Sequence, residues 1–269
     1  SVVIASLILT VCVAAVLIGG VKRIASVSQI VVPFMAILYF AFAVILIICN
    51  ITEIPAAVKV IVTAAFTPKA VTGGAVGSMF VAMQKGVARG IFSNEAGLGS
   101  APIAAAAAQT KEPVRQGLVS MTGTFIDTIV ICTLTGLSIV LTGAWQVEGL
   151  EGVEVTTYAY QQGLPFPPAV SSFVLMLCLV FFAFTTILGW DYYSERCLEY
   201  LSGGNLKHVK VYRWIYIFAV FIGPYMTVSA VWTIADIFNG LMALPNMIAL
   251  FALSGVVVKE TKAFFKKQS

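Results

Sequence analysis

The polar side chains that could bind a ligand are concentrated where one apolar segment is interrupted. Residues 93–100 are Ser-Asn-Glu-Ala-Gly-Leu-Gly-Ser, and they interrupt the otherwise apolar segment 73–109. A broken helix in lipid would leave backbone N–H and C=O groups without hydrogen bonds. Such a break persists where it lines a water-filled cavity or holds a ligand. The segment therefore predicts a binding site within the membrane, of the kind that transporters use.

The break offers several kinds of ligand. Exposed N–H groups can hold a substrate carboxylate, and free C=O groups can coordinate Na⁺. Gly97 and Gly99 permit close backbone approach and unusual dihedral angles, and Ser93, Asn94 and Ser100 add polar atoms at its edges. Glu95 has two interpretations: it ties down N–H groups freed at the break, or it contacts the substrate or ion directly.

Four residues in other apolar segments are further candidates for binding the substrate or a cation. Asp127 either pairs with a polar group on another helix, helps to coordinate a cation, or relays a proton. The hydroxyls of Thr185 and Thr186 either bond the carbonyl of the preceding helical turn or serve as oxygen ligands for a small cation. Trp190 either bounds a small pocket or packs between helices.

Composition places the chain in the membrane. Of its 269 residues, 59% are hydrophobic and 10% are charged, with a mean hydropathy of +0.97. Soluble domains carry about 25% charged residues, so we expect an all-α polytopic membrane protein. Five scattered cysteines and one histidine form no metal-ligand spacing or nucleophile–base arrangement, which argues against an enzyme or a metal site other than one for Na⁺.

Hydropathy predicts seven spans and basic residues predict their orientation. Twelve of the sixteen Lys and Arg residues fall in alternate connections and in the carboxy-terminal tail. The positive-inside rule then places the amino end outside and the carboxy end in the cytoplasm. The segments 52–68 and 143–168 become outer connections, each either a lid or a surface loop. The predicted spans are residues 2–20, 30–49, 76–109 (broken), 116–142, 169–194, 211–232 and 234–258.

A seven-helix receptor or retinal protein fits this topology only superficially. The last predicted span, 234–258, has no lysine for a Schiff base, and the glycine-rich break is foreign to that class.

The residues around the break resemble the sodium:alanine/glycine symporter family. The resemblance rests on Gly90–Pro102, continues through 104–117 and 123–128, and includes 184–190 and Pro245-Asn246. It implies a leucine-transporter-like fold with two inverted five-helix repeats. The seven spans then correspond to helices 4 to 10, and the broken segment to a discontinuous helix 6. A weak echo between 33–38 and 245–250 either reflects the inverted repeat or arises by chance.

The resemblance also implies a domain organisation. The chain is expected to be a single transporter domain truncated at its amino end. Residues 1–50 would be the end of the first repeat, 51–258 the second repeat, and 259–269 a cytoplasmic tail. Helices 1 to 3 would be absent, so the chain is not expected to transport by itself.

The resemblance implies import of a small neutral amino acid, alanine or glycine, coupled to Na⁺ across the plasma membrane. No cofactor and no nucleic-acid partner are expected. The alternative is H⁺-coupled or exchange transport on the same fold, with Asp127 and Glu95 on a proton route. Sodium would use Thr185 and Thr186. The expected substrate-binding residues are Ser93, Asn94, Gly97, Leu98, Gly99, Thr186 and Trp190.

Overall fold

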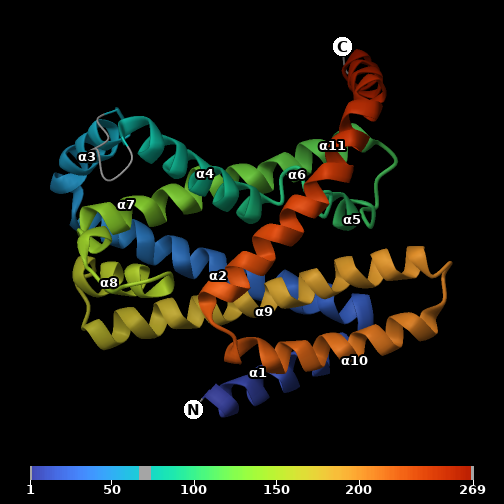
Figure 1. Ribbon diagram of the computed structural model, residues 1–269, viewed down its shortest axis with the longest axis horizontal. Coiled ribbons are helices and arrows are strands. Elements are labelled where there is room, and N and C mark those ends of the chain that lie inside the picture. Colours follow the sequence, from blue (N-terminus) through green and yellow to red (C-terminus); the bar gives the residue numbers. More distant parts are fainter. Residues whose placement is uncertain (1, 67–73, 268–269) are drawn as a thin grey trace. The chain divides into compact units, whose positions relative to one another are not determined.

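The computed structural model describes residues 2–66 and 74–267, and every regular element in these residues is helical (Figure 1). The main helices are α1 (Val2–Leu17), α2 (Gly20–Cys49), α3 (Ile54–Phe66), α4 (Gly74–Asn94), α5 (Ala101–Ala105), α6 (Pro113–Thr124), α7 (Thr133–Leu141), α8 (Val153–Gly163), α9 (Pro168–Leu201), α10 (Leu206–Ile222) and α11 (Val228–Lys266). Short 3₁₀ turns lie at Ile51–Glu53, Ala144–Gln146 and Gly223–Tyr225, and a π-helical stretch, η2, joins α6 to α7 at Phe125–Cys132.

Helix length and hydropathy confirm a polytopic membrane protein. Within the described residues, four helical stretches are long and apolar enough to cross a bilayer: Gly20–Cys49, Pro113–Leu141, Pro168–Leu201 and Val228–Lys266. The first helix, α1, is apolar but shorter, at 16 residues. A helix needs about 20 residues to span the hydrocarbon layer unaided.

Several predicted helix boundaries are wrong. The predicted connection 21–29 is helical, because α2 begins at Gly20, directly after the turn that ends α1. The predicted boundary between residues 232 and 234 lies instead at Gly223-Pro224, where proline interrupts the helical hydrogen bonds. The new helix is capped by Thr227, whose side chain accepts a hydrogen bond from the Ala230 N–H at 3.3 Å. Because hydropathy is continuous across these residues, it did not reveal either of these two helix boundaries.

The chain forms two compact units that interleave along the sequence. Unit 1 takes the described residues of 1–27, 90–125 and 186–269, and unit 2 takes those of 28–89 and 126–185. The unit boundaries fall inside α2, α4, η2 and α9.

Unit 2 has a core of aromatic and small residues at the meeting point of α2, α7, α8 and α9. The rings of Tyr39 and Tyr160 stack at 5.9 Å, and the Tyr39 hydroxyl lies 2.5 Å from the Thr135 hydroxyl on α7. Tyr160 is 1% exposed, and this burial raises the pKa of its hydroxyl above the usual value. Helix α8 lies within the predicted outer connection 143–168, so that connection is a packed helix in its central part.

A polar clamp joins α2 to α8. The side-chain N–H₂ group of Asn50 donates to the Leu46 carbonyl at 2.8 Å and to the Gly163 carbonyl at 2.9 Å. Gly163 has no room for a side chain, since a Cβ there would lie 2.8 Å from both Leu46 Cγ and Thr142 Cγ2. The clamp therefore depends on a glycine at the end of α8.

Unit 1 is built around α10. Helix α1 packs along α10 (Figure 1). Arg213 on α10 makes a two-pronged ion pair with Glu195 on α9, at 2.5 and 2.9 Å, and the Tyr216 hydroxyl donates to the Ile187 carbonyl at 2.8 Å. Arg213 lies near the start of the predicted span 211–232. It packs against α9 in a helical hairpin, because α9 continues to Leu201.

Replacing Gly163 tests the clamp. We expect Gly163→Ala to lower the free energy of unfolding by about 1–3 kcal/mol, because the added methyl overpacks Leu46 and Thr142. The matched control is Gly136→Ala on α7, where a Cβ meets nothing within 4 Å. Thermal unfolding in detergent compares the two. Equal melting temperatures for both variants would contradict the tight contact at Gly163.

Candidate functional site

The predicted break is present as a turn between two helices. Helix α4 ends at Asn94 and α5 begins at Ala101. Between them the chain enters the left-handed region three times, at Glu95 (φ +53°), Gly97 (φ +81°) and Gly99 (φ +81°). Glycine adopts this region freely, whereas a residue with a Cβ does so at a cost of about 1–2 kcal/mol. Glu95 therefore needs compensating contacts.

Glu95 obtains those contacts from its own turn and from α9. The Ser100 hydroxyl donates to Glu95 Oε2 at 2.7 Å, and Ser100 is 1% exposed. Tyr193 on α9 lies within hydrogen-bonding reach of the same carboxylate. The carboxylate thus closes the turn on itself and links it to α9. The role of Glu95 stays a prediction, because the donor to its carboxylate is a side-chain hydroxyl and not one of the backbone N–H groups freed at the break.

Helix α11 covers another side of the break. A Cβ on Gly99 would lie 3.0 Å from Asn246 Oδ1. One turn before the break, the Phe92 ring meets the Trp232 ring edge to face, with centroids 5.0 Å apart. A Cβ at position 99 would therefore fit only if the Asn246 side chain moved by a few tenths of an ångström.

Tyr193 connects the break to the predicted residues of α9. The rings of Tyr193 and Trp190 meet edge to face with centroids 5.7 Å apart, and Trp190 is half-buried. Thr186 lies one turn before Trp190 and is exposed on α9. Unit 1 therefore holds the break, Thr186 and Trp190, with Tyr193 between the break and Trp190. Their binding roles remain predictions.

The other predicted substrate residues line the turn itself. Ser93 is exposed at the end of α4, and the Asn94 side chain donates to the Gly90 carbonyl at 3.0 Å. Leu98 is buried, with 4% exposed, and anchors the turn between its two left-handed glycines.

Thr185 and Asp127 belong to unit 2. The Thr185 hydroxyl donates to the Phe181 carbonyl at 2.9 Å, which is the helix-internal bond that the sequence analysis allowed. Asp127 is half-buried in the π-helical stretch η2. Single π-turns inside α-helices are rare and often mark functional positions. No sequence signal predicted this one.

Three residues in or beside the site had no predicted role in the sequence. Tyr193 and Asn246 contact the break from α9 and α11, and Asp191 lies on α9 beside Trp190 with its side chain completely buried. Asp191 is the one of these with a local signal, because a carboxylate within an apolar helix is costly unless paired.

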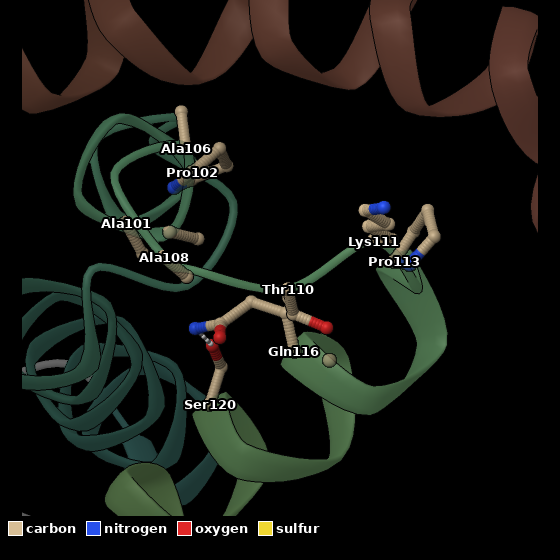
Figure 2. Close-up of a pocket in the computed structure, with 11 residues that line it drawn as sticks. Ala101, Pro102, Ala106, Ala108, Thr110, Lys111, Pro113, Gln116 and Ser120 are labelled. Atoms are coloured by element: carbon tan, nitrogen blue, oxygen red, sulfur yellow. Dashed lines mark hydrogen bonds between the residues drawn. The ribbon is translucent and has the colours of Figure 1, made fainter.

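A cavity of about 500 Å³ lies beside the break and contains none of the predicted site residues. It is formed by α5, the following connection and the start of α6 (Figure 2). Its walls are mostly alanine and proline, with Lys111 at one end and Gln116, whose side-chain amide donates to the Ser120 hydroxyl at 3.4 Å. This cavity is separate from the residues expected to hold the substrate.

The whole chain, residues 1–269, matches the model of the sodium:alanine symporter family. The chain belongs to this family. Its members are transporters and not enzymes, so the chain is a multi-pass membrane transport protein or part of one.

Curated relatives match nearly the whole chain but only part of their own length. The sodium/alanine symporter AgcS of Methanococcus maripaludis is 46% identical over 96% of this chain and 55% of the relative. The probable sodium/glutamine symporter GlnT of Bacillus subtilis is 39% identical over 93% of this chain and 51% of the relative. The putative sodium/proton-dependent alanine carrier protein YrbD of Bacillus subtilis is 37% identical over 88% of this chain and 51% of the relative. The chain thus spans about half the length of these relatives.

A double-mutant cycle tests the contact between the break and α11. We expect Gly99→Ala to destabilise the protein more than Gly97→Ala, because both positions have φ +81° but only Gly99 faces Asn246. Removing the obstructing side chain with Asn246→Ala should recover the difference, giving a coupling of about 0.5–3 kcal/mol. Thermal unfolding of the variants measures it. Additive effects of the Gly99 and Asn246 changes would contradict the close approach.

Proposed function

We propose that this chain supplies much of a secondary transporter that imports alanine or glycine together with Na⁺. Family membership and the sodium/alanine symporter among the relatives support the transport class and the substrate. The observation that carries the proposal is the break at 95–100, whose carboxylate is held by Ser100 and whose left-handed Gly97 leaves its backbone open to the surroundings.

Substrate recognition would use the backbone of the break and the face of α9 beside it. The backbone at Gly97 can approach a small zwitterion closely, because a glycine has no Cβ and no other side chain of the described residues lies beside that position. Trp190 would limit the space for the substrate side chain, which favours alanine or glycine over bulky amino acids. The proposed contacts are Ser93, Asn94, Gly97, Leu98, Gly99, Thr186 and Trp190.

Sodium would bind at Thr185 and Thr186. A hydroxyl that donates its hydrogen to a backbone carbonyl keeps lone pairs on oxygen that can coordinate a cation. The bond from Thr185 to Phe181 is therefore compatible with a role as ligand.

The proposed architecture is the leucine-transporter-like fold. The seven predicted spans would be helices 4 to 10, with the break in helix 6 and repeats divided at residue 50. The protein would lie in the plasma membrane with the amino end of this chain outside and its carboxy end in the cytoplasm.

Proton-coupled transport on the same fold is the second candidate. The name of one relative, the putative sodium/proton-dependent alanine carrier protein YrbD, favours it. In this version Asp127 and Glu95 would lie on a proton route.

Radiolabelled alanine uptake into proteoliposomes tests the function. The protein would be this chain alone, and this chain joined to the part of the Methanococcus symporter that it does not match. We expect uptake by the joined protein only, and only with an inward Na⁺ gradient. Uptake that responds to an inward H⁺ gradient without Na⁺ would favour the second candidate. A folded joined protein that takes up no small amino acid would contradict the proposal.

Conservative threonine variants test the sodium site. Thr186→Val keeps the shape of the side chain and removes its oxygen, so we expect the apparent affinity for Na⁺ to fall about tenfold, equivalent to about 1.4 kcal/mol. Thr157→Val is the control, because Thr157 is half-buried on α8, far along the sequence from the break and from α9, and its hydroxyl donates within its own helix to the Val153 carbonyl at 2.9 Å. The sodium dependence of uptake gives the affinities. Unchanged sodium dependence in Thr186→Val would exclude this oxygen as a ligand.

A further inference from the structure

Asp191 is the most unusual charged residue in unit 1. Its side chain is 0% exposed, and neither carboxylate oxygen has a hydrogen-bond partner among the described residues. One turn further along α9, Glu195 is 2% exposed but has both oxygens bonded by Arg213, at 2.5 and 2.9 Å. Both oxygens of the Glu195 carboxylate therefore have hydrogen-bond partners, whereas those of Asp191, one turn before it, have none among the described residues.

The nearby positive charge is already paired with Glu195 and is not available to Asp191. The Arg213 guanidinium and the Glu195 carboxylate neutralise each other, and their two-pronged geometry places two N–H donors on Glu195. An ionised Asp191 would add a second negative charge beside Glu195, in an apolar setting and without a donor. A buried carboxyl group in that position takes up a proton in preference to remaining charged.

The other groups that face Asp191 do not change this balance. From α10 these are Tyr212 and Tyr216, and the Tyr216 hydroxyl donates to the Ile187 carbonyl at 2.8 Å. Tyr212 is within hydrogen-bonding reach of Ser194. Helix α1, which packs on α10, contributes one titratable group in its described residues, the exposed Cys12.

We propose that Asp191 is a proton-binding site that holds its carboxyl group in the neutral form in the resting protein. Release breaks the carboxyl O–H bond and passes the proton to water, and no electrons are transferred. Once ionised, Asp191 competes with Glu195 for Arg213, so proton release is linked to the ion pair that joins α9 to α10.

The same event reaches the proposed substrate site, and this step rests on the proposed transport function. Asp191 follows Trp190 directly, and the Ser194 hydroxyl donates to the Trp190 carbonyl at 2.9 Å. Trp190 packs on Tyr193, which faces Glu95 in the break. Proton binding at Asp191 therefore acts on Trp190, which bounds the proposed substrate pocket.

Infrared spectroscopy tests the proton directly and without substrate. The chain has three aspartates, Asp127, Asp191 and Asp236. With carboxyl-¹³C-labelled aspartate incorporated, a protonated aspartate is identified by an isotope-shifted C=O stretching band. We expect this band in the unmodified chain in lipid vesicles at neutral pH, and its loss in Asp191→Asn, whose neutral amide has the shape of the protonated acid.

Two matched variants keep the test decisive even if Asp191→Asn does not fold. Asp127→Asn and Asp236→Asn should both retain the band, which assigns it to Asp191 by elimination. Absence of a protonated aspartate band from the unmodified chain, or its loss in either of these two variants, would overturn the proposal.

Uptake by the joined protein separates the proton site from the transport function. We expect external pH to alter alanine uptake in the unmodified protein and to have no effect in Asp191→Asn, with Na⁺-driven uptake retained. An identical pH profile in the two proteins would contradict the link to transport. The band without uptake of any amino acid would support the proton site and contradict the proposed function.

Discussion

Every backbone N–H and C=O group within a membrane needs a hydrogen-bond partner or water, and in the proposed site this constraint would apply at residues 95–100. Glu95 adopts a left-handed conformation in which its carboxylate receives the Ser100 hydroxyl. The same residue faces Tyr193, which packs on Trp190. One carboxylate thus holds the turn and connects it to α9.

Glycine has two different uses in this protein. At Gly97 it supplies a left-handed conformation in open space. At the helical Gly163 it avoids a Cβ that would lie 2.8 Å from Leu46 and Thr142, and at the left-handed Gly99 it avoids a Cβ that would lie 3.0 Å from Asn246 Oδ1. The first use serves the exposed backbone of the break, and the second allows close contact with α11 or with α2. Composition alone does not distinguish them, because the neighbour comes from a distant part of the chain.

The sequence predicted the membrane class, the family and the position of the break, because each produces a local pattern. A carboxylate and two glycines inside an apolar run mark the break without knowledge of any neighbour. The ends of helices were harder to predict, since hydropathy runs continuously through Gly223 and Pro224. The roles of Tyr193, Asn246 and Arg213 depend on pairings between helices, and the sequence around each residue does not specify its partner.

The most direct test of the account is a double-mutant cycle between Glu95 and Ser100, with affinity for alanine measured in the presence of Na⁺. If the bond between them shapes the site, Glu95→Ala and Ser100→Ala should each weaken binding, and the double variant should be about as weak as Glu95→Ala alone. The coupling should then be about 0.5–3 kcal/mol. Independent, additive effects would contradict the account, as would an unchanged affinity in all three variants, because either result would separate the turn from substrate binding.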